Sequence, residues 1–286
     1  MKSKAWWFGL RVAILVGLIE CVGLFGAIRL VVAAFTLPRG SRIRVRVRGL
    51  RQPVCVRARG SDTLVFVQVF ALQEYNFDEF AQRTLVDDRY QAILKSGRKP
   101  LIIDCGANVG FASLWFAARF PEAVIMAVEA SPDNFALLRE NVAAYPNIIP
   151  LNAAIWDVPA RMRITNPGDA AWVLEVAPVD ATAPLTPSGE GGAEIDAVTI
   201  PDLLQRNPDW AAFITKIDIE GAESALFRSN TGWMPAMAFI AIEVHDRLQP
   251  FKSVGRNFYR EIGKHDVEMV FSRENIFIFF RIPNEG

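Results

Sequence analysis

The pattern of apolar and polar residues divides the chain into three zones. Residues 1–38 hold its most apolar stretch, and residues 39–99 carry short alternating runs. In residues 100–286, apolar runs of strand length alternate with amphipathic runs of helix length. We therefore expect an apolar N-terminal helix, then a small β lead-in element, then a main domain of alternating strands and helices.

The apolar stretch Ala5–Leu37 is interrupted by Arg11, Glu20 and Arg29, at intervals of nine residues. On one continuous helix, this spacing puts both arginines on one face and Glu20 on the opposite face. The apolar residues between the arginines are about as many as the shortest bilayer span. Glu20, near the middle, would cost about 3 kcal/mol there. The pattern predicts either a membrane anchor or a helix buried against the domain or a partner.

Charge around this stretch bears on targeting and orientation. A cleaved signal peptide fits poorly, because charges break the apolar run and no clean A-x-A site follows. More arginines follow the stretch than basic residues precede it. If it spans a membrane, the positive-inside rule places the rest of the chain in the cytoplasm. We expect a cytoplasmic protein, with residues 5–37 as the candidate anchor.

The lead-in zone contains three runs with strand character. Arg42–Arg48 alternates strictly, which predicts a strand with an arginine face and an apolar face. A nucleic-acid surface is one interpretation, but an amphipathic strand with an exposed or membrane-facing charged side is favoured. Pro53–Arg57 and Thr63–Phe70 are expected to be two further strands, joined by a turn at Ala58–Asp62.

The main zone alternates between predicted strands and helices, which indicates a mostly parallel sheet with helices on both faces. The expected strands are Leu101–Asp104, Ala123–Glu129, Ile148–Leu151, Ala212–Ile217 and Ala238–Val244, and the expected helices are Phe111–Arg119, Asn134–Ala144, Ile200–Gln205, Ala222–Ser229 and Asn257–Lys264. Val267–Phe271 and Ile276–Arg281 should form a closing hairpin, Met162–Thr165 and Trp172–Val176 are short strand candidates, and Leu185–Ala193 should be an irregular loop.

Composition narrows the chemistry. Lys and Arg balance Asp and Glu at 31 each, which argues against a protein built to hold nucleic acid. The three cysteines, Cys21, Cys55 and Cys105, show neither zinc nor disulfide spacing. Two histidines cannot build a multi-histidine metal site. The chemistry must therefore depend on carboxylates, backbone amides or a cofactor.

The segment Asp104–Gly110 lies between a predicted strand and a predicted helix, where α/β sheets bind ligands. Gly106 allows a tight turn and a close backbone approach, and Gly110 lets the helix start near a ligand. Asp104 could receive the amino group of a methionine moiety, directly or through water. Glu129, at the end of the next strand, could grip both hydroxyls of a ribose.

The glycine spacing distinguishes this loop from dinucleotide-binding loops and P-loops. The dinucleotide pattern G-x-G-x-x-G is absent, since the spacing is G-x-x-x-G with Asn108 in place of the second glycine, and no P-loop pattern occurs. An acidic residue before the first glycine suits a cationic sulfonium amino acid better than a pyrophosphate. The loop therefore favours S-adenosylmethionine as cofactor.

Several motifs, in order from Asp104 to Asp246, make the chain resemble the FkbM-type methyltransferases. They read DCGANVGF, AVEASPDNFALLRENV, LNAAIWD, AVTIPDLL, KIDIEGAE and IEVHD, and VRARGSDTLVFVQVFALQEY resembles the β lead-in of such proteins. The resemblance implies a Rossmann-like, seven-stranded methyltransferase sheet. The cofactor residues that it implies are Asp104, Gly106, Ala107, Asn108, Gly110, Glu129 and Ala130, with Asn152 and Ala153 near the adenine. Ala130 stands where the family usually has proline.

The candidate catalytic residues follow two other predicted strands. Asp218 and Glu220 come after one strand and His245 after its neighbour, so Asp218 and His245 could converge over the sulfonium. His245 is expected to be a base tuned near neutral pH, with Asp218 or Glu243 orienting it or binding substrate. Such a base is worth roughly 10²–10⁴-fold in rate. The alternative is a structural role, in which these acidic residues cap the following helix. A divalent-metal site at Asp218, Glu220 and His245 is conceivable, but we expect no metal.

The sequence thus predicts an S-adenosylmethionine-dependent O-methyltransferase acting on a hydroxyl of a sugar or glycolipid. The expected partner is a small-molecule or glycan acceptor, not a nucleic acid. One alternative is a membrane-tethered scaffold that binds the cofactor without chemistry. A nicotinamide oxidoreductase is the other, and the glycine spacing disfavours it.

Overall fold

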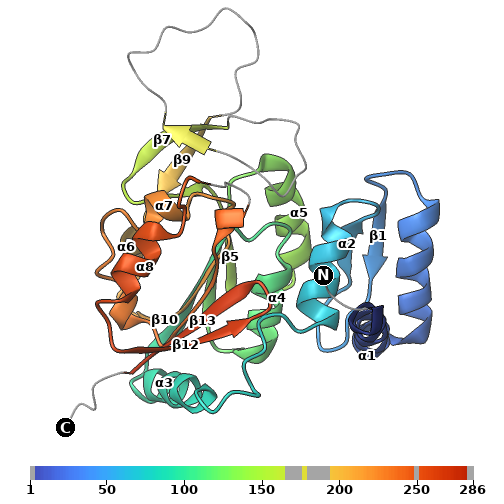
Figure 1. Cartoon of the computed structure of the whole chain (residues 1–286), viewed down its shortest axis with the longest axis horizontal. Coiled ribbons are helices and arrows are strands. Elements are labelled where there is room, and N and C mark those ends of the chain that lie inside the picture. Colours follow the sequence, from blue (N-terminus) through green and yellow to red (C-terminus); the bar gives the residue numbers. More distant parts are fainter. Residues whose placement is uncertain (1–3, 165–175, 179–193, 248–250, 282–286) are drawn as a thin grey trace, which may run out of the picture.

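A seven-stranded mixed sheet is the centre of the computed structural model, which describes residues 4–164, 176–178, 194–247 and 251–281 (Figure 1). The strands run in the order β12-β13-β11-β10-β3-β4-β5. Their bounds are β3 Lys99–Cys105, β4 Val124–Glu129, β5 Ile148–Asn152, β10 Trp210–Ile217, β11 Phe239–Glu243, β12 Val267–Ser272 and β13 Asn275–Phe280. The pairs from β11 to β5 are parallel, and the β12–β13 hairpin adds two antiparallel strands. The expected Rossmann-like methyltransferase sheet is confirmed.

Helices cover both faces of this sheet (Figure 1). Strand alternation sends Ile102 into one core, and Leu101 and Ile103 into the other. The first core is closed by α3 Arg83–Lys95, α4 Phe111–Arg119 and α5 Pro132–Val142, and the second by α6 Ile200–Leu204, α7 Glu223–Leu226, η2 Met234–Ala236 and α8 Arg256–Ile262. The chain can build two cores because its parallel strands are apolar on both sides.

Capping residues explain where two of these helices begin. The Ser131 side chain accepts a hydrogen bond from the Asn134 amide at the start of α5. Thr199 and Asp202 form a reciprocal capping box at the start of α6. Both helices also carry proline in the first turn, where its missing N–H is not needed.

A second, four-stranded sheet lies beside the main one, in the order β6-β9-β7-β8. Its strands are β6 Ala154–Ile155, β7 Ala160–Ile164, β8 Val176–Pro178 and β9 Glu194–Val198. The strand expected at Met162–Thr165 corresponds to β7. The expected strand Trp172–Val176 lies outside the described residues except for Val176, and the expected loop Leu185–Ala193 lies wholly outside them.

The lead-in zone is a mixed element, and the strand expected at Thr63–Phe70 is wrong. Strands β1 Arg42–Val45 and β2 Val54–Arg57 form a small antiparallel sheet, but the next residues form α2 Ser61–Phe66, which continues as a π-helical turn, η1 Val67–Ala71. Phe66 and Phe70 lie one helical turn apart, and both rings pack on Phe111 of α4, at centroid distances of 5.6 and 5.5 Å. Tertiary packing of this face outweighs the strand preference of the β-branched residues.

The N-terminal helix α1, Lys4–Thr36, is bent rather than straight. Gly23 has φ 75° and ψ 166°, which breaks the helix into two parts, residues 4–22 and 24–36. One part is seen end-on and the other along its length (Figure 1). The Cys21 carbonyl accepts the Arg48 amide at 2.8 Å, so the bend is tied to the lead-in element. The arrangement expected for a straight helix, with Arg11 and Arg29 on one face, therefore does not hold.

Candidate active site

The loop from β3 to α4 is shaped by backbone contacts that require glycine. The amides of Gly106 and Ala107 both donate to the Val128 carbonyl, at 3.0 and 2.9 Å. Gly106 has φ +79°, and a Cβ there would lie 1.8 Å from the backbone oxygen of Asp218. Gly110 has φ +90°, and its Cβ would meet Leu138 of α5 at 2.6 Å. The two glycines thus bring the loop against the end of β10 and start α4 against α5.

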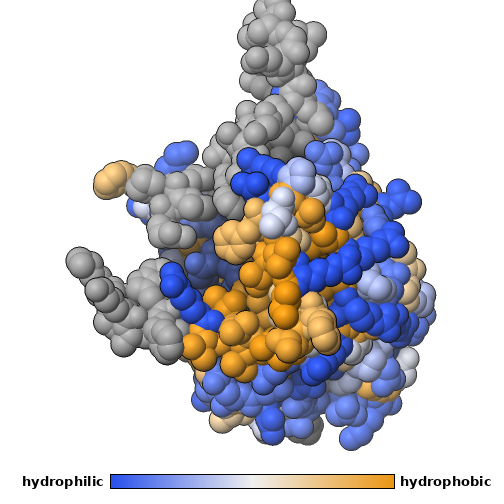
Figure 2. All heavy atoms as spheres, turned by 90° about the vertical axis from the view of Figure 1, so that its right-hand side faces the viewer, coloured by the Kyte–Doolittle hydropathy of each residue, from blue (hydrophilic) through white to orange (hydrophobic). Residues whose placement is uncertain are grey.

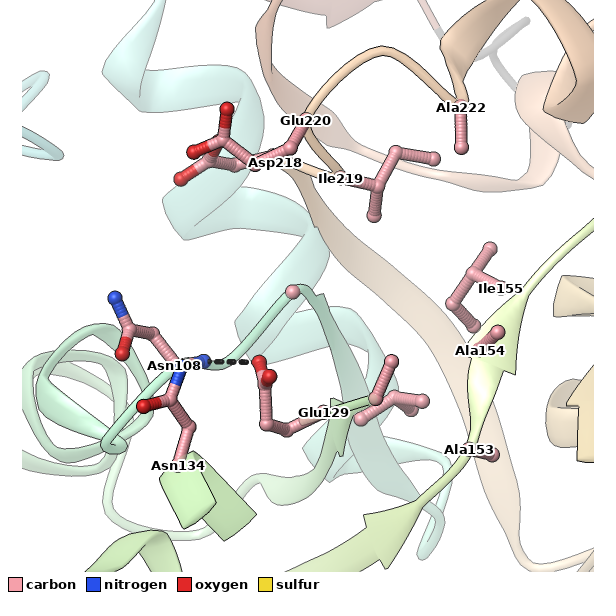
Figure 3. A pocket seen from close by; sticks show the side chains of 13 residues that line it. Asn108, Glu129, Asn134, Ala153, Ala154, Ile155, Asp218, Ile219, Glu220 and Ala222 are labelled. Carbon is pink, nitrogen blue, oxygen red and sulfur yellow. Dashed lines mark hydrogen bonds between the residues drawn. The ribbon is translucent and has the colours of Figure 1, made fainter. Parts of the chain in front are cut away.

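Glu129, at the end of β4, organises the same loop (Figure 3). Its two carboxylate oxygens accept the backbone amides of Asn108 and Ser131, each at 2.8 Å. Burial raises the pKa of Glu129, and these two amides act against that rise. A carboxylate oxygen has two lone pairs, so each oxygen can accept one amide and still accept a hydroxyl. The residue can therefore hold the loop and a ribose at once.

A cavity, called here the loop cavity, lies between this loop and the end of β10 (Figure 3). Its walls are Gly106, Asn108, Val128, Glu129, Ala130, Asn134, Ala153, Ala154, Ile155, Asp218, Ile219, Glu220 and Ala222. It is narrow, with about 70 Å³ of free volume. Hydrogen-bond acceptors at Glu129 and the unpaired, buried Asn108 Oδ1 match the hydroxyl and ammonium donors of S-adenosylmethionine.

Five of the predicted cofactor residues line this cavity: Gly106, Asn108, Glu129, Ala130 and Ala153. Asn152 lies behind it and donates from Nδ2 to the Glu129 carbonyl at 2.8 Å, which fixes the turn after β4. Gly110 and Ala107 act through the loop backbone. Asn134, Ala154, Ile155, Ile219 and Ala222 also line the cavity and were not predicted. The alanines and isoleucines carry no chemical signature in a sequence, and Asn134 lies inside a helix, so only the fold could assign these residues to the cavity.

Asp104 is fully buried beneath the loop and does not line the loop cavity. Its Oδ2 accepts the Ser113 hydroxyl at 2.6 Å, and its Oδ1 lies 3.3 Å from the Lys216 ammonium. Lys216 also donates to the Gly106 carbonyl at 2.6 Å and lies 3.5 Å from Asp218. Burial alone would lower the pKa of Lys216, but Asp104, Tyr75 and Asp218 raise it well above its ordinary value. Asp104 and Lys216 thus form a buried ion pair that supports the loop.

His245, on the short helix η3 His245–Arg247, is surrounded by carboxylates. Its Nδ1 lies 2.8 Å from Glu223 Oε1, and its side chain is only 4% exposed. Its Nε2 lies 3.4 Å from Glu220, 3.5 Å from Glu243 and 3.6 Å from Asp218. Asp218 and His245 converge as expected, and Glu220 joins them. The residue at hydrogen-bond distance that orients the ring is Glu223, not Asp218 or Glu243 as expected. Ligand atoms of the same three residues lie within 4.8 Å of one another, so they could also hold a divalent cation.

The carboxylates change the protonation of this cluster. Burial would lower the pKa of His245, but the hydrogen bond to Glu223 and the charges of Glu223, Asp218 and Glu220 raise it to about 9. The expected near-neutral tuning of His245 is therefore wrong, because the carboxyl groups of Glu223, Asp218 and Glu220 stabilise the imidazolium. Burial, followed by the charge of Asp218, raises the pKa of Glu220 to about 7. Glu220 also has φ +53°, a strained backbone for a non-glycine residue and one typical of functional positions.

A second cavity of about 490 Å³, called here the carboxylate cavity, meets the loop cavity. Gly106, Asn108, Asp218 and Glu220 line both cavities. The polar end of the carboxylate cavity holds Glu74, Tyr75, Lys216, Glu243, His245 and Glu274, and its apolar wall comes from α1, α2 and η1. Glu74 was missed from the sequence because it follows the segment wrongly expected to be a strand. Burial, with Asp218 and Glu274, raises the pKa of Glu74 to about 7.

The fold and the site together define an α/β protein with a glycine loop, a carboxylate at the end of β4 and an acid–base cluster opposite. Residues 104–274 match the family described as the methyltransferase FkbM domain, and the chain belongs to this methyltransferase family, as the sequence motifs implied. Family and fold imply S-adenosylmethionine as cofactor.

The chain is also similar to individual proteins. The chain is similar to the hexuronic acid methyltransferase AglP of Haloferax volcanii, with 21% identity over 213 residues, which are 73% of this chain and 81% of AglP. It is 32% identical over 65 residues to methyltransferase sdnD of Sordaria araneosa, covering 23% of this chain and 25% of sdnD. Among solved structures, the Methanococcus jannaschii fibrillarin pre-rRNA processing protein superposes with a TM-score of 0.36 and 13% identity, covering 63% of this chain and 65% of that one.

Proposed function

We propose that the protein transfers the methyl group of S-adenosylmethionine to a hydroxyl of a small-molecule or glycan acceptor, namely a sugar. The observation that carries this proposal is the meeting of the two cavities at Gly106, Asn108, Asp218 and Glu220. A cofactor held by the loop and Glu129 would present its methyl group at that junction. An acceptor in the carboxylate cavity would approach from the opposite side, as in-line displacement requires.

The chain's own residues would manage the proton of the acceptor. S-adenosylmethionine supplies a methyl group on positive sulfur, which is displaced when the acceptor oxygen forms its bond to carbon. The hydroxyl proton passes to Glu220, whose pKa of about 7 suits a base at neutral pH. His245 keeps its proton at that pH and stabilises Glu220 and Asp218. Glu223 holds the imidazole ring by its Nδ1. No metal is needed in this scheme, since Lys216 and His245 supply positive charge.

The carboxyl groups also bear on the class of acceptor. Glu74, Asp218, Glu220, Glu243 and Glu274 line the carboxylate cavity, against the cations Lys216 and His245. A sugar can donate hydroxyl hydrogen bonds to these carboxyl groups. AglP acts on a hexuronic acid. We propose that the present protein methylates a sugar hydroxyl, to give an ether.

The test is incubation of the protein with S-adenosylmethionine labelled in the methyl group and with glycans extracted from cells. A hydroxyl acceptor gives label that survives mild alkaline hydrolysis, because an ether is stable there. Label released as methanol would come from a methyl ester and would refute the hydroxyl as acceptor. Cofactor binding without any transfer to the extract would favour the non-catalytic scaffold.

Two matched variants test the acid–base roles. Glu220→Gln should bind cofactor normally and lose roughly 10²–10⁴-fold in transfer rate. The wild-type rate should rise with pH through about 7 and fall towards about 9, as Glu220 and then His245 lose their protons. His245→Gln should remove the alkaline fall. A Glu220→Gln variant with an unchanged rate would eliminate Glu220 as the base.

A further inference from the structure

The bent helix α1 exposes a large apolar area, called here the apolar face of α1. Its exposed members are Val12, Leu15, Val16, Leu24, Phe25, Ile28, Val31, Val32 and Phe35, and Leu64 of α2 is exposed as well. Phe25 is 87% exposed and Phe35 79%. Figure 2 shows a continuous hydrophobic area on this side of the molecule, bordered by hydrophilic residues. Soluble monomers rarely expose apolar patches of this extent, and such patches mark protein or membrane contacts.

The geometry of α1 argues against a single span. Among the residues that the structure describes, one helix, Gly9–Thr36, is long and apolar enough to cross a membrane. The bend at Gly23 divides α1 into residues 4–22 and residues 24–36, about 29 and 20 Å of helix, so neither part exceeds a hydrocarbon core of about 30 Å. Leu18, Ala27, Leu30 and Ala33 are buried against the protein. A Cβ on Gly17 would lie 2.0 Å from the Ala71 carbonyl oxygen, so α1 packs tightly on η1.

The charged residues of α1 fit a helix that lies flat. Glu20 lines a groove with Arg48 and Arg119, where the bilayer centre would not reach it. Arg11 and Arg29 are exposed beside the apolar residues, where their long side chains can reach lipid headgroups. The cost of a carboxylate at mid-membrane, expected for a spanning helix, therefore does not arise.

Charge is distributed very unevenly along the chain. Residues 1–61 contain 12 Lys and Arg but one acidic residue, Glu20, whereas residues 62–286 contain 19 basic and 30 acidic residues. Arg39, Arg42, Arg44, Arg46, Arg48 and Arg51 follow α1 and are exposed. Arg42 and Arg44 also share Glu140, at 3.2 and 3.0 Å. This end of the molecule complements an anionic lipid surface, and the rest of the chain would be repelled by it.

The carboxylate cavity reaches the same side of the molecule. Its apolar wall includes Ile14 of α1 and Leu64, Val65 and Val67 of α2 and η1, while its other end holds Glu220 and His245. Ile14 precedes the exposed Leu15, and Leu64 is itself 60% exposed. The apolar wall of the cavity is therefore continuous with the apolar face of α1.

We propose that α1 docks in the plane of an anionic bilayer and that the carboxylate cavity opens at the bilayer surface, to take an acceptor whose hydroxyl is carried on a lipid. The docking stands on the apolar face and the charge distribution alone. The nature of the acceptor rests in addition on the proposed methyl transfer. The acceptor's polar part would reach Glu220, and its alkyl part would follow the apolar wall into the bilayer.

Vesicle co-sedimentation of the full chain tests the docking. The protein should bind phosphatidylcholine vesicles that contain phosphatidylglycerol, bind more weakly in high salt, and leave the vesicles in an alkaline carbonate wash. Phe25→Ser with Phe35→Ser should lower vesicle affinity by about tenfold or more per phenylalanine. The matched control, Phe271→Ser, changes a phenylalanine 72% exposed on β12 and should have no effect.

Three results with vesicles would overturn the docking. They are an absence of binding to the anionic vesicles, equal binding by the double variant, and retention after the carbonate wash, which indicates a spanning helix. A lipid-free dimer that the double variant dissociates would instead assign the apolar face to a second copy of the chain.

A second readout separates this inference from the proposed function. With labelled S-adenosylmethionine and vesicles made from total membrane lipid, label should enter the lipid phase for the wild type and drop for the double phenylalanine variant. Glu220→Gln should fail to transfer label and still bind the vesicles. Label that enters only water-soluble products would refute a lipid-borne acceptor while leaving the methyl transfer itself intact.

Discussion

Replacing Glu129 by glutamine isolates the role of its charge, because the side chain keeps its size. In the wild type, both carboxylate oxygens accept backbone amides, from Asn108 and Ser131, each at 2.8 Å. Glutamine offers one oxygen and one NH₂ group, so one amide must face a donor. The same change removes one of the two acceptors available to a ribose. The perturbation therefore acts on the loop and on the cofactor at one position.

The expected magnitude follows from these contacts. A hydrogen bond to a charged group contributes about 1.5–3 kcal/mol, which corresponds to roughly 10–150-fold in affinity. We expect Glu129→Gln to weaken binding of S-adenosylhomocysteine by that factor in isothermal titration calorimetry. The product is used because it carries the same ribose without the reactive methyl group.

The control for this experiment is Glu122→Gln, at an exposed position just before β4. It makes the same chemical change away from the loop cavity, and its affinity should equal that of the wild type. An unchanged affinity in Glu129→Gln would refute the ribose contact. A circular dichroism spectrum and a melting temperature close to those of the wild type would show that the loss is not due to unfolding.

Three further predictions concern stability, pH and metal. Gly106→Ala should lose at least about 2 kcal/mol of unfolding free energy, measured by urea denaturation, because the new Cβ meets the Asp218 carbonyl and φ is positive. The control is Gly97→Ala, where φ is +78° but the space around the Cβ is open, and this variant should lose clearly less. Equal losses in the two variants would contradict the steric argument. The raised pKa values of Glu220 and His245 mean that the folded state binds protons more tightly than the unfolded state. The stabilisation from each group is therefore complete below its ordinary pKa and is lost as the pH rises. The free energy of unfolding should fall between pH 4.5 and about 7 because of Glu220, and between pH 6.5 and about 9 because of His245. In the His245→Gln variant, the urea concentration at the unfolding midpoint should no longer fall between pH 6.5 and about 9. A wild-type midpoint that rises with pH over these ranges would show that the sign is wrong. EDTA should leave methyl transfer unchanged, and a loss restored by Mg²⁺ or Mn²⁺ would instead establish a metal at Asp218, Glu220 and His245.

Local sequence predicted much of the site. The loop Asp104–Gly110 and Glu129 could be placed because a buried apolar strand must end before a polar, glycine-rich turn, and parallel strands end at one edge of the sheet. The same reasoning brought Asp218 and His245 together. It could not assign the partners of each side chain, since Glu223 and His245 are 22 residues apart and meet only in the folded chain. Asp104 was therefore expected at the cofactor, whereas the structure pairs it with Lys216.

The sequence by itself determined the central sheet, the cofactor loop and the apolar character of the N-terminal helix, since these depend on periodicity and on residues near one another in the chain. The tertiary structure decided the rest. It made Ser61–Phe66 a helix, because its aromatic face packs on α4. It also bent α1 at Gly23, next to the point where the Arg48 amide donates a hydrogen bond to the Cys21 carbonyl. Both outcomes depend on contacts between segments far apart in sequence, and hydrophobic pattern alone does not encode which segments meet.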